Sequence, residues 1–355
     1  MKPAPVEGHG VYNRSSRVQA AGLSPAVPLL EQAARTVTLA AAPEAIVLAD
    51  YGSSEGHNSL GPLAVAIDAL RERVGPERAI SIVHTDLPEN DFTALFQTLI
   101  ADPNSYLRGD PAVFVSAVGR SFYDQILPSQ SVTLGWSSWA VQWLSQVPAQ
   151  IPDQVQVAYS RDPAAWAAFG RQAASDWQRF LTHRGRELRP GGRLVVLTMA
   201  IDEGGNFGYR PLLEAMYAAL MDLVEKGFVR VEEAQRMVIP TVGRSRADIV
   251  APFGESGRFA GLSLEEVEVF HGEDRIWAEF EGNGDALAFG ARWAAFSRAS
   301  VFPTLAAGLE GGRNDPRAIP FVEQLESGLA GRLAATPEPM LIPLAKMLLA
   351  KDIER

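Results

Sequence analysis

The sequence of 355 residues contains no cysteine, which excludes disulfide bonds, thiolate nucleophiles, iron–sulfur clusters and cysteine-ligated zinc sites. It has only five histidines, and none of them forms the HExxH pattern of zinc enzymes. A metal centre would therefore need mainly carboxylate ligands, and no pattern of acidic residues indicates one. We predict a protein without a metal site.

Basic residues are too few and too scattered for binding to a nucleic acid. Lys and Arg total 32 against 42 Asp and Glu, giving a formal charge of -10, and no basic block interrupts this balance. Long apolar runs and a signal-like segment after Met1 are also lacking. We therefore expect a soluble, cytoplasmic protein with no nucleic-acid or membrane partner. The 47% apolar content suffices for a large core.

Short apolar runs alternate with helical patterns through the first 200 residues. Five such runs, each typical of a buried strand, are residues 45–49, 79–84, 112–118, 131–136 and 193–198. The longest helical pattern covers 163–188 and is expected to stop at Pro190-Gly191-Gly192. This alternation predicts an α/β fold with a mostly parallel central sheet, whose ligand crevice lies at the carboxyl ends of the strands.

The pattern loosens after residue 200, where helices are expected to cover the crevice instead of forming a second domain. The predicted parts of one domain over 1–355 are an N-terminal arm (1–24), an α/β core (25–200), helical cap segments (201–261 and 284–335) and returns to the sheet (262–283 and 336–355).

Two segments at predicted strand ends carry groups suited to a nucleotide-like ligand. In the first, Gly52 lets backbone approach a ligand that Asp50 and Asn58 could hydrogen-bond. Its spacing is not GxGxxG, and taken alone it is explained better by an ordinary strand-to-helix turn. In the second, Asp86 ends a strand where ribose hydroxyls bind in doubly wound sheets, although it could equally cap the following turn.

Five sequence blocks follow one another in an informative order: residues 12–19 (YNRSSRVQ), 49–58 (ADYGSSEGHN), 86–92 (DLPENDF), 121–123 (SFY) and 143–148 (WLSQVP). They resemble the motifs SYxxNSxxQ, ADLGCSSGPN, DLPGNDFN, SFY and WLSQVP of the SABATH methyltransferases. This family includes salicylate, benzoate, jasmonate and indole-3-acetate carboxyl methyltransferases and xanthine N-methyltransferases. Ser15 departs from it, because Asn is usual there. The similarity is strongest before Pro148 and vague after Gly261.

The resemblance implies a Rossmann-like methyltransferase core under a helical cap, with S-adenosylmethionine (SAM) as cofactor and S-adenosylhomocysteine (SAH) as its product. It also implies a homodimer, and the abundance of Ala, Gly and Arg suggests a bacterial member. The family's cofactor contacts carry over to Tyr12, Ser16, Asp50, Gly52, Asn58, Asp86, Leu87, Ser121 and Phe122. Asp86 is expected to bind both ribose hydroxyls, and Ser121 and Phe122 to bracket the adenine. Asp50 and Asn58 are expected near the methionine portion.

Methyl transfer to a carboxylate needs no general base, because an acid with a pKa of about 4 is already ionised at neutral pH. The enzyme must instead align the carboxylate and exclude water, preferably with uncharged donors that do not blunt its attack. The Gln19 amide and the Trp143 indole match the family's carboxylate-binding positions, and we predict that they are the catalytic pair. Without the family blocks, Trp139 and Trp143 would more often form a buried helix face.

The predicted substrate-binding residues are Gln19, Trp139, Gln142, Trp143, Leu212, Leu213, Ser297 and Ser300. Several of these depart from salicylate-type enzymes toward smaller or more polar side chains, as in Leu212-Leu213 in place of Ile-Trp. We therefore expect a wider pocket that prefers an elongated acid, such as an indole-3-acetate-like compound, over benzoate or salicylate.

Three other functions stay open at this stage. One is N-methylation of a purine-like heterocycle, for which Gln19 could also serve. Another is a dinucleotide-dependent oxidoreductase, supported by the sheet pattern and Asp86 but opposed by the missing GxGxxG. The third is a catalytically silent ligand-binding protein with the same fold.

Overall fold

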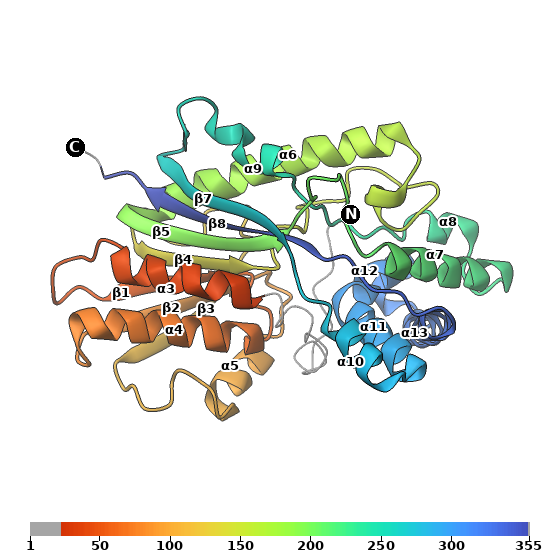
Figure 1. Cartoon of the computed structure of the whole chain (residues 1–355), viewed down its shortest axis with the longest axis horizontal. Coiled ribbons are helices and arrows are strands. Elements are labelled where there is room, and N and C mark those ends of the chain that lie inside the picture. The colour runs from red at the N-terminus through yellow and green to blue at the C-terminus, as the bar shows by residue number, and fades with distance from the viewer. Residues whose placement is uncertain (1–22, 354–355) are drawn as a thin grey trace.

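The predicted strands pair into one eight-stranded sheet with the order β3-β2-β1-β4-β5-β8-β7-β6 in the computed structural model, which describes residues 23–353 (Figure 1). The strands are β1 (Ile46–Tyr51), β2 (Ile80–Asp86), β3 (Val113–Gly119), β4 (Val132–Ser138), β5 (Leu188–Met199), β6 (Arg258–Phe259), β7 (Leu262–His271) and β8 (Pro343–Lys351). Strands β1 to β5 are parallel, and β8 runs antiparallel between β5 and β7. This confirms the predicted mostly parallel sheet.

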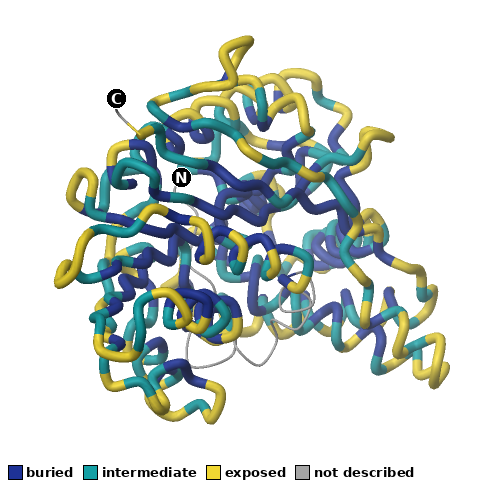
Figure 2. The backbone as a smooth tube through the Cα atoms, turned by 60° about the vertical axis from the view of Figure 1, so that its left-hand side comes forward, coloured by how far each residue is buried: buried dark blue, intermediate teal, exposed yellow. Residues whose placement is uncertain are grey.

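Helices cover both faces of the sheet. On one face lie α3 (Val27–Thr36), α4 (His57–Val74) and α5 (Phe92–Ala101), and on the other lie α6 (Pro163–Glu187) and α9 (Arg246–Val250). Each face of the sheet has its own apolar core, because side chains alternate along a strand. Leu48 of β1 packs in the core on the α3 face with Leu30, and its neighbour Ala49 packs in the core on the α6 face with Trp177. Figure 2 shows the buried residues concentrated along the strands at the centre of the molecule.

The remaining helices gather beyond the carboxyl ends of the parallel strands and form the cap (Figure 1). They are α7 (Arg210–Glu225), α8 (Val231–Ala234), α10 (Arg275–Asn283), α11 (Ala286–Ser300), α12 (Phe302–Ala306) and α13 (Ala318–Ala335). Helix α13 packs against both α7 and α11. Within residues 23–353, no helix combines the length and the apolar character needed to cross a bilayer, and no group of acidic or histidine side chains is arranged to hold a metal ion.

Three segments differ from the sequence-based expectation. Helix α6 ends at Glu187 and β5 starts at the next residue, so Pro190-Gly191-Gly192 lies inside a strand. The register between β4 and β5 shifts there, and such irregularities tolerate Pro and Gly. Residues 275–283, expected in the sheet, form α10, whose N-cap Asp274 accepts from Trp277 N at 2.9 Å. Helix α9, expected in the cap, packs on β7 because Ile249 belongs to the core beside α6.

Candidate active site

A cavity of about 650 Å³ lies between the carboxyl ends of the parallel strands and the cap. Every parallel strand contributes to its wall, through Gly52 after β1, Asp86 at the end of β2, Ser121 after β3, Trp139 after β4 and Met199 at the end of β5. The opposite wall comes from α7, α11 and the segment after α12. This is the location predicted for the crevice, and the volume suits a small-molecule site.

Most of the predicted site residues meet in this cavity. Those that line it are Gly52, Asp86, Leu87, Ser121, Phe122, Trp139, Gln142, Trp143, Leu212, Leu213, Ser297 and Ser300. Asp50 and Asn58 are not among its lining residues. Tyr12, Ser16 and Gln19 lie outside the described residues.

Asp86 joins the loops after β1 and β2 on the wall of the cavity. Its Oδ2 accepts from Ser54 N and its Oδ1 accepts from Leu87 N, both at 2.7 Å. Burial raises the pKa of Asp86 to about 6, although these two hydrogen bonds oppose the rise, and the charge of Asp50 adds to it. Each carboxylate oxygen keeps a further lone pair, so Asp86 can still accept hydrogen bonds from a pair of hydroxyls.

A glycine is required at position 52 for a structural reason that the sequence did not indicate. Its φ of +91° is left-handed, and a Cβ built on it would lie 2.4 Å from the Cβ of Ala140. The first close approach is therefore between two loops of the protein, the one after β1 and the one after β4. A larger residue at position 52 would separate the loops that form the cavity wall.

Asp50 lies beneath the site and holds elements together. It is only 2% exposed, and its Oδ2 accepts from Ser59 Oγ at 2.6 Å and lies 2.9 Å from His84 Nδ1. The other ring nitrogen of His84 lies 2.6 Å from the hydroxyl of Tyr106. These contacts tie β1 to α4 and β2, and the expected contact of Asp50 with the methionine portion stays a prediction.

Helix α6 fixes the loop that carries Phe122. The buried guanidinium of Arg184 donates to Phe122 O at 2.7 Å and to Asp124 O at 2.9 Å. Arg184 also forms an ion pair of 2.8 Å with Glu187, and both side chains are fully buried. The second oxygen of Glu187 accepts from Tyr51 Oη at 2.8 Å. The loop expected to bracket an adenine is thus held from behind by buried charges.

The same helix fixes the segment that carries Trp143. Asp176 accepts from the backbone N of Ser145 at 2.8 Å and from its Oγ at 2.7 Å. The hydroxyl of Tyr123 donates to Trp143 O at 2.5 Å, and an isolated bridge pairs Trp143 with Thr241. Within residues 23–353, the indole N–H of Trp143 donates to no protein group. A fixed backbone thus presents an uncharged donor at a side chain that lines the cavity.

Polar side chains among the predicted substrate-binding residues already form hydrogen bonds within the protein. Gln142 Nε2 donates to Trp139 O at 2.6 Å, and its Oε1 accepts from Thr198 Oγ1 at 3.1 Å. Ser297 and Ser300 each donate to the carbonyl four residues earlier in α11, at 3.0 and 2.6 Å. Their hydroxyl oxygens offer acceptor lone pairs but no free donor, so they make the pocket less polar than their residue types suggest.

Sequence reasoning missed several residues of the cavity wall, namely Gln156, Phe207, Tyr209, Thr241 and Arg313. Phe207 and Tyr209 follow β5, so the rule that ligands bind after parallel strands would have indicated them. The other three carry no local signal. Burial lowers the pKa of Arg313, and the charge of Glu89 opposes this change.

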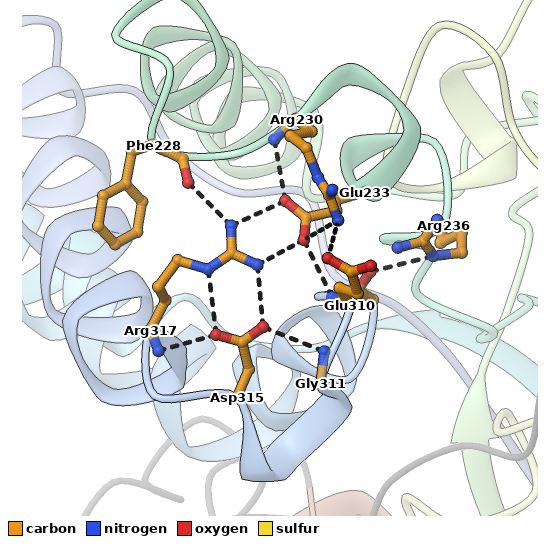
Figure 3. Close-up of polar contacts among 9 residues, drawn as sticks. Phe228, Arg230, Glu233, Arg236, Glu310, Gly311, Asp315 and Arg317 are labelled. Atoms are coloured by element: carbon orange, nitrogen blue, oxygen red, sulfur yellow. Dashed lines mark hydrogen bonds and ion pairs between the residues drawn. The ribbon is translucent and has the colours of Figure 1, made fainter.

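An ion-pair cluster of Glu233, Asp315 and Arg317 holds the cap segment over residues 311–315 (Figure 3). This segment contains Arg313. The Nη2 atom of Arg317 lies 2.5 Å from Glu233 Oε1 and 2.9 Å from Asp315 Oδ2. Asp315 also accepts from Gly311 N at 3.1 Å, which closes the segment over residues 311–315. Arg317 holds the pKa of Glu233 down at about 2. The cluster joins α8 to the start of α13.

The parallel sheet, the cavity at its strand ends and the helical cap together define a Rossmann-like α/β protein with a capped cavity. A family model described as "SAM dependent carboxyl methyltransferase" matches residues 4–314, and the chain belongs to this family. This confirms the resemblance to the SABATH methyltransferases.

A solved structure of loganic acid methyltransferase with SAH has the same fold, with a TM-score of 0.79 over 98% of this chain and 99% of that one, at 20% identity. Among curated proteins, Methyltransferase LUC1 of a Fusarium species is 31% identical over 250 residues, which are 69% of this chain. The match spans 65% of that relative, slightly less than two thirds of its length. The benzoic acid/salicylic acid carboxyl methyltransferase 2 of Petunia hybrida is 29% identical, over 74% of this chain and 77% of that protein.

Proposed function

We propose that the protein transfers the methyl group of SAM to the carboxylate of a small organic acid, giving a methyl ester and SAH. One observation carries this proposal. Asp86, Ser121 and Phe122, which match the family's cofactor positions, line the same cavity as Trp143, which matches its carboxylate position. A donor and an acceptor molecule can thus share one cavity of about 650 Å³.

The residues of the cavity fit the cofactor. Asp86 has lone pairs left for the ribose hydroxyls, and Phe122 offers a ring face beside Tyr123, at a centroid separation of 4.7 Å. When bound, SAM supplies an electrophilic methyl group: a carboxylate oxygen forms the new bond to carbon while the carbon–sulfur bond breaks and its electron pair stays on sulfur.

In this proposal the chain positions the acid and requires no general base. The Trp143 indole N–H, together with the Gln19 amide, orients the carboxylate without placing a full positive charge on it. Leu212 and Leu213 of α7 supply apolar wall that excludes water from the nucleophile. The preference for an elongated acid expected from the sequence is part of the same proposal.

The homodimer and the cytoplasmic location expected from the sequence also stay proposals. Light scattering coupled to gel filtration measures the assembly, and fractionation of the source cells measures the location.

The test is a screen for methyl esters by mass spectrometry, with SAM and a panel of benzoate, phenylacetate, indole-3-acetate and a medium-chain fatty acid. We expect ester formation, with benzoate not preferred, and Trp143→Phe should lower kcat/KM roughly ten- to hundredfold while SAH affinity stays unchanged. Trp277→Phe in the cap is the control, because Trp277 does not line the cavity.

Calorimetry with SAH and NAD separates the classes of function. Binding of NAD without SAH would indicate an oxidoreductase, and SAH binding with no ester from any acid would indicate a different methyl acceptor or a silent binder. Full activity of Trp143→Phe would remove the indole from the mechanism. Clear preference for benzoate would contradict the wider pocket.

A further inference from the structure

A second cavity of about 220 Å³ adjoins the first one. Much of its wall comes from α6, including Phe169 and Trp177, and from the segment 242–244. Two residues, Gln156 and Phe207, line both cavities. They therefore belong to the wall that separates the two spaces.

Hydrogen bonds fix the polar part of this wall. Gln156 is 1% exposed, and its Nε2 donates to Thr241 O at 2.7 Å and to Thr241 Oγ1 at 2.9 Å. Its Oε1 accepts from Ala158 N at 2.8 Å. Displacing Gln156 would leave its buried amide and the partly buried N–H of Ala158 unpaired, so this part of the wall resists movement.

Packing alone fixes the ring of Phe207. It is 6% exposed and meets Tyr159 edge to face, with ring centroids 6.5 Å apart. A Cβ built on Gly243 would lie 3.0 Å from Phe207 Cδ2 and 2.5 Å from Ala200 O, so Gly243 leaves the room that the ring occupies. The Tyr159 hydroxyl donates to Gly208 O at 2.5 Å and holds the loop beside the ring.

The second cavity is suited to an apolar group. The Trp177 indole N–H already donates to Ile249 O at 3.1 Å, and the Arg244 guanidinium donates to Val141 O at 2.6 Å and Ala173 O at 3.2 Å. These N–H groups donate to the backbone around the cavity, whereas the Nε atom of Arg244 is buried without a hydrogen-bond partner within residues 23–353. What remains toward the space is dominated by aromatic and aliphatic surface, such as Phe169.

We propose that Phe207 sets the length limit of the acid, and that the second cavity is the space a longer apolar tail enters when the ring is removed. This inference rests on the proposed methylation of a carboxylate, and it makes the substrate class an acid whose apolar tail ends against Phe207. The carboxylate lies toward Trp143, and the limit acts at the part of the wall formed by the loop after β5.

The test measures kcat/KM for a series of ω-phenylalkanoic acids of increasing chain length with wild type, Phe207→Ala and Phe169→Ala. Phe169→Ala is the control, because this variant also removes a buried phenyl ring from the wall of the second cavity, whereas Phe169 does not line the first cavity. Phe207→Ala should shift the preferred chain to a longer one, with a gain of roughly tenfold or more for acids that wild type rejects. Phe169→Ala should keep the wild-type profile.

Binding of the same acids to the SAH complex, measured by calorimetry, reads the length limit without turnover. Phe207→Leu, a smaller change that is milder for folding, should shift the limit in the same direction, and a thermal shift with SAH confirms the folded state of each variant. An unchanged profile in Phe207→Ala and Phe207→Leu, or an equal shift in Phe169→Ala, would overturn the proposal. If wild type forms no ester and binds no acid, the proposed function itself fails.

Discussion

Burial raises the pKa of Asp86, whose carboxyl lies on the wall of the cavity, to about 6. The ionised form offers the most acceptor capacity to ribose hydroxyls, and protonation removes one acceptor site. Because this form predominates only above the raised pKa, SAH affinity should hold at neutral pH and fall as the pH drops through 6. Calorimetry should show a loss of roughly tenfold between about pH 7.5 and about pH 5.

Asp86→Asn is the control for this pH dependence, since its side chain does not titrate. Its affinity for SAH should be weak and flat over the same range. A wild-type affinity that does not change with pH would show that the charge of Asp86 contributes nothing to cofactor binding.

Single residues could be predicted where a local motif identified them. Asp86 and Trp143 stand in blocks whose order indicated the family, and both line the cavity. Gln156 and Phe207 could not be predicted as one wall, because segments 51 residues apart in the sequence meet there only through tertiary packing. The sequence also could not show that the Ser297 hydroxyl donates to a carbonyl of its own helix instead of pointing its donor into the cavity.

At the level of elements, α6 supports both halves of the site from behind. Asp176 holds the Trp143 segment, and the Arg184–Glu187 pair holds the Phe122 loop. Because both segments are bonded to the same long helix, their distance from each other is fixed. Changes on its buried side should therefore act on stability and on cofactor binding together.

Glu187→Gln tests this role of α6. The variant leaves the fully buried Arg184 without its counter-charge and turns an amide N–H toward groups that donate to Glu187, such as Tyr51 Oη. We expect a loss of about 3–5 kcal/mol in the free energy of unfolding, measured with urea and circular dichroism, and weaker SAH binding. Glu214→Gln, in an exposed pair with Arg210, should change stability by less than about 1 kcal/mol. Equal stability of the two variants would contradict this.

Elements with strong local patterns were predictable, and those set by neighbours were not. The five parallel strands follow from their apolar runs. The start of β5 was missed because Pro190 usually ends regular structure, whereas the irregular pairing with β4 accommodates it here. Helix α10 was missed because its segment is short and mixes apolar with charged residues, although Asp274 gives a capping signal.

For the molecule as a whole, the cap shares an apolar core with the sheet and also contains a cluster of ion pairs. Glu233 is buried beside Arg317, which holds the Glu233 pKa at about 2, below its ordinary value of 4.5. A carboxyl with a lowered pKa in the folded state contributes stability above its ordinary pKa and loses it as the pH falls toward the folded value. The contribution is therefore complete at neutral pH.

Glu233→Gln should lower the free energy of unfolding by about 1–3 kcal/mol at neutral pH. The difference from wild type should be the same at about pH 7 and about pH 5, and it should shrink below about pH 4 as the unfolded chain becomes protonated. Urea titrations at about pH 7, about pH 5 and about pH 3 measure this difference. A difference that grows on acidification would show that the Glu233–Arg317 pair does not stabilise the cap.

The position of β8 has a consequence for how the chain is made. Its residues, 343–351, lie between β5 and β7 in the sheet but are synthesised after both of these strands. While a ribosome is still synthesising the cap, the edges of β5 and β7 have no partner and can pair with other nascent chains. The complete eight-stranded sheet therefore forms only after β8 has left the ribosome, and until then the edges of β5 and β7 that β8 will cover remain sites for pairing between chains.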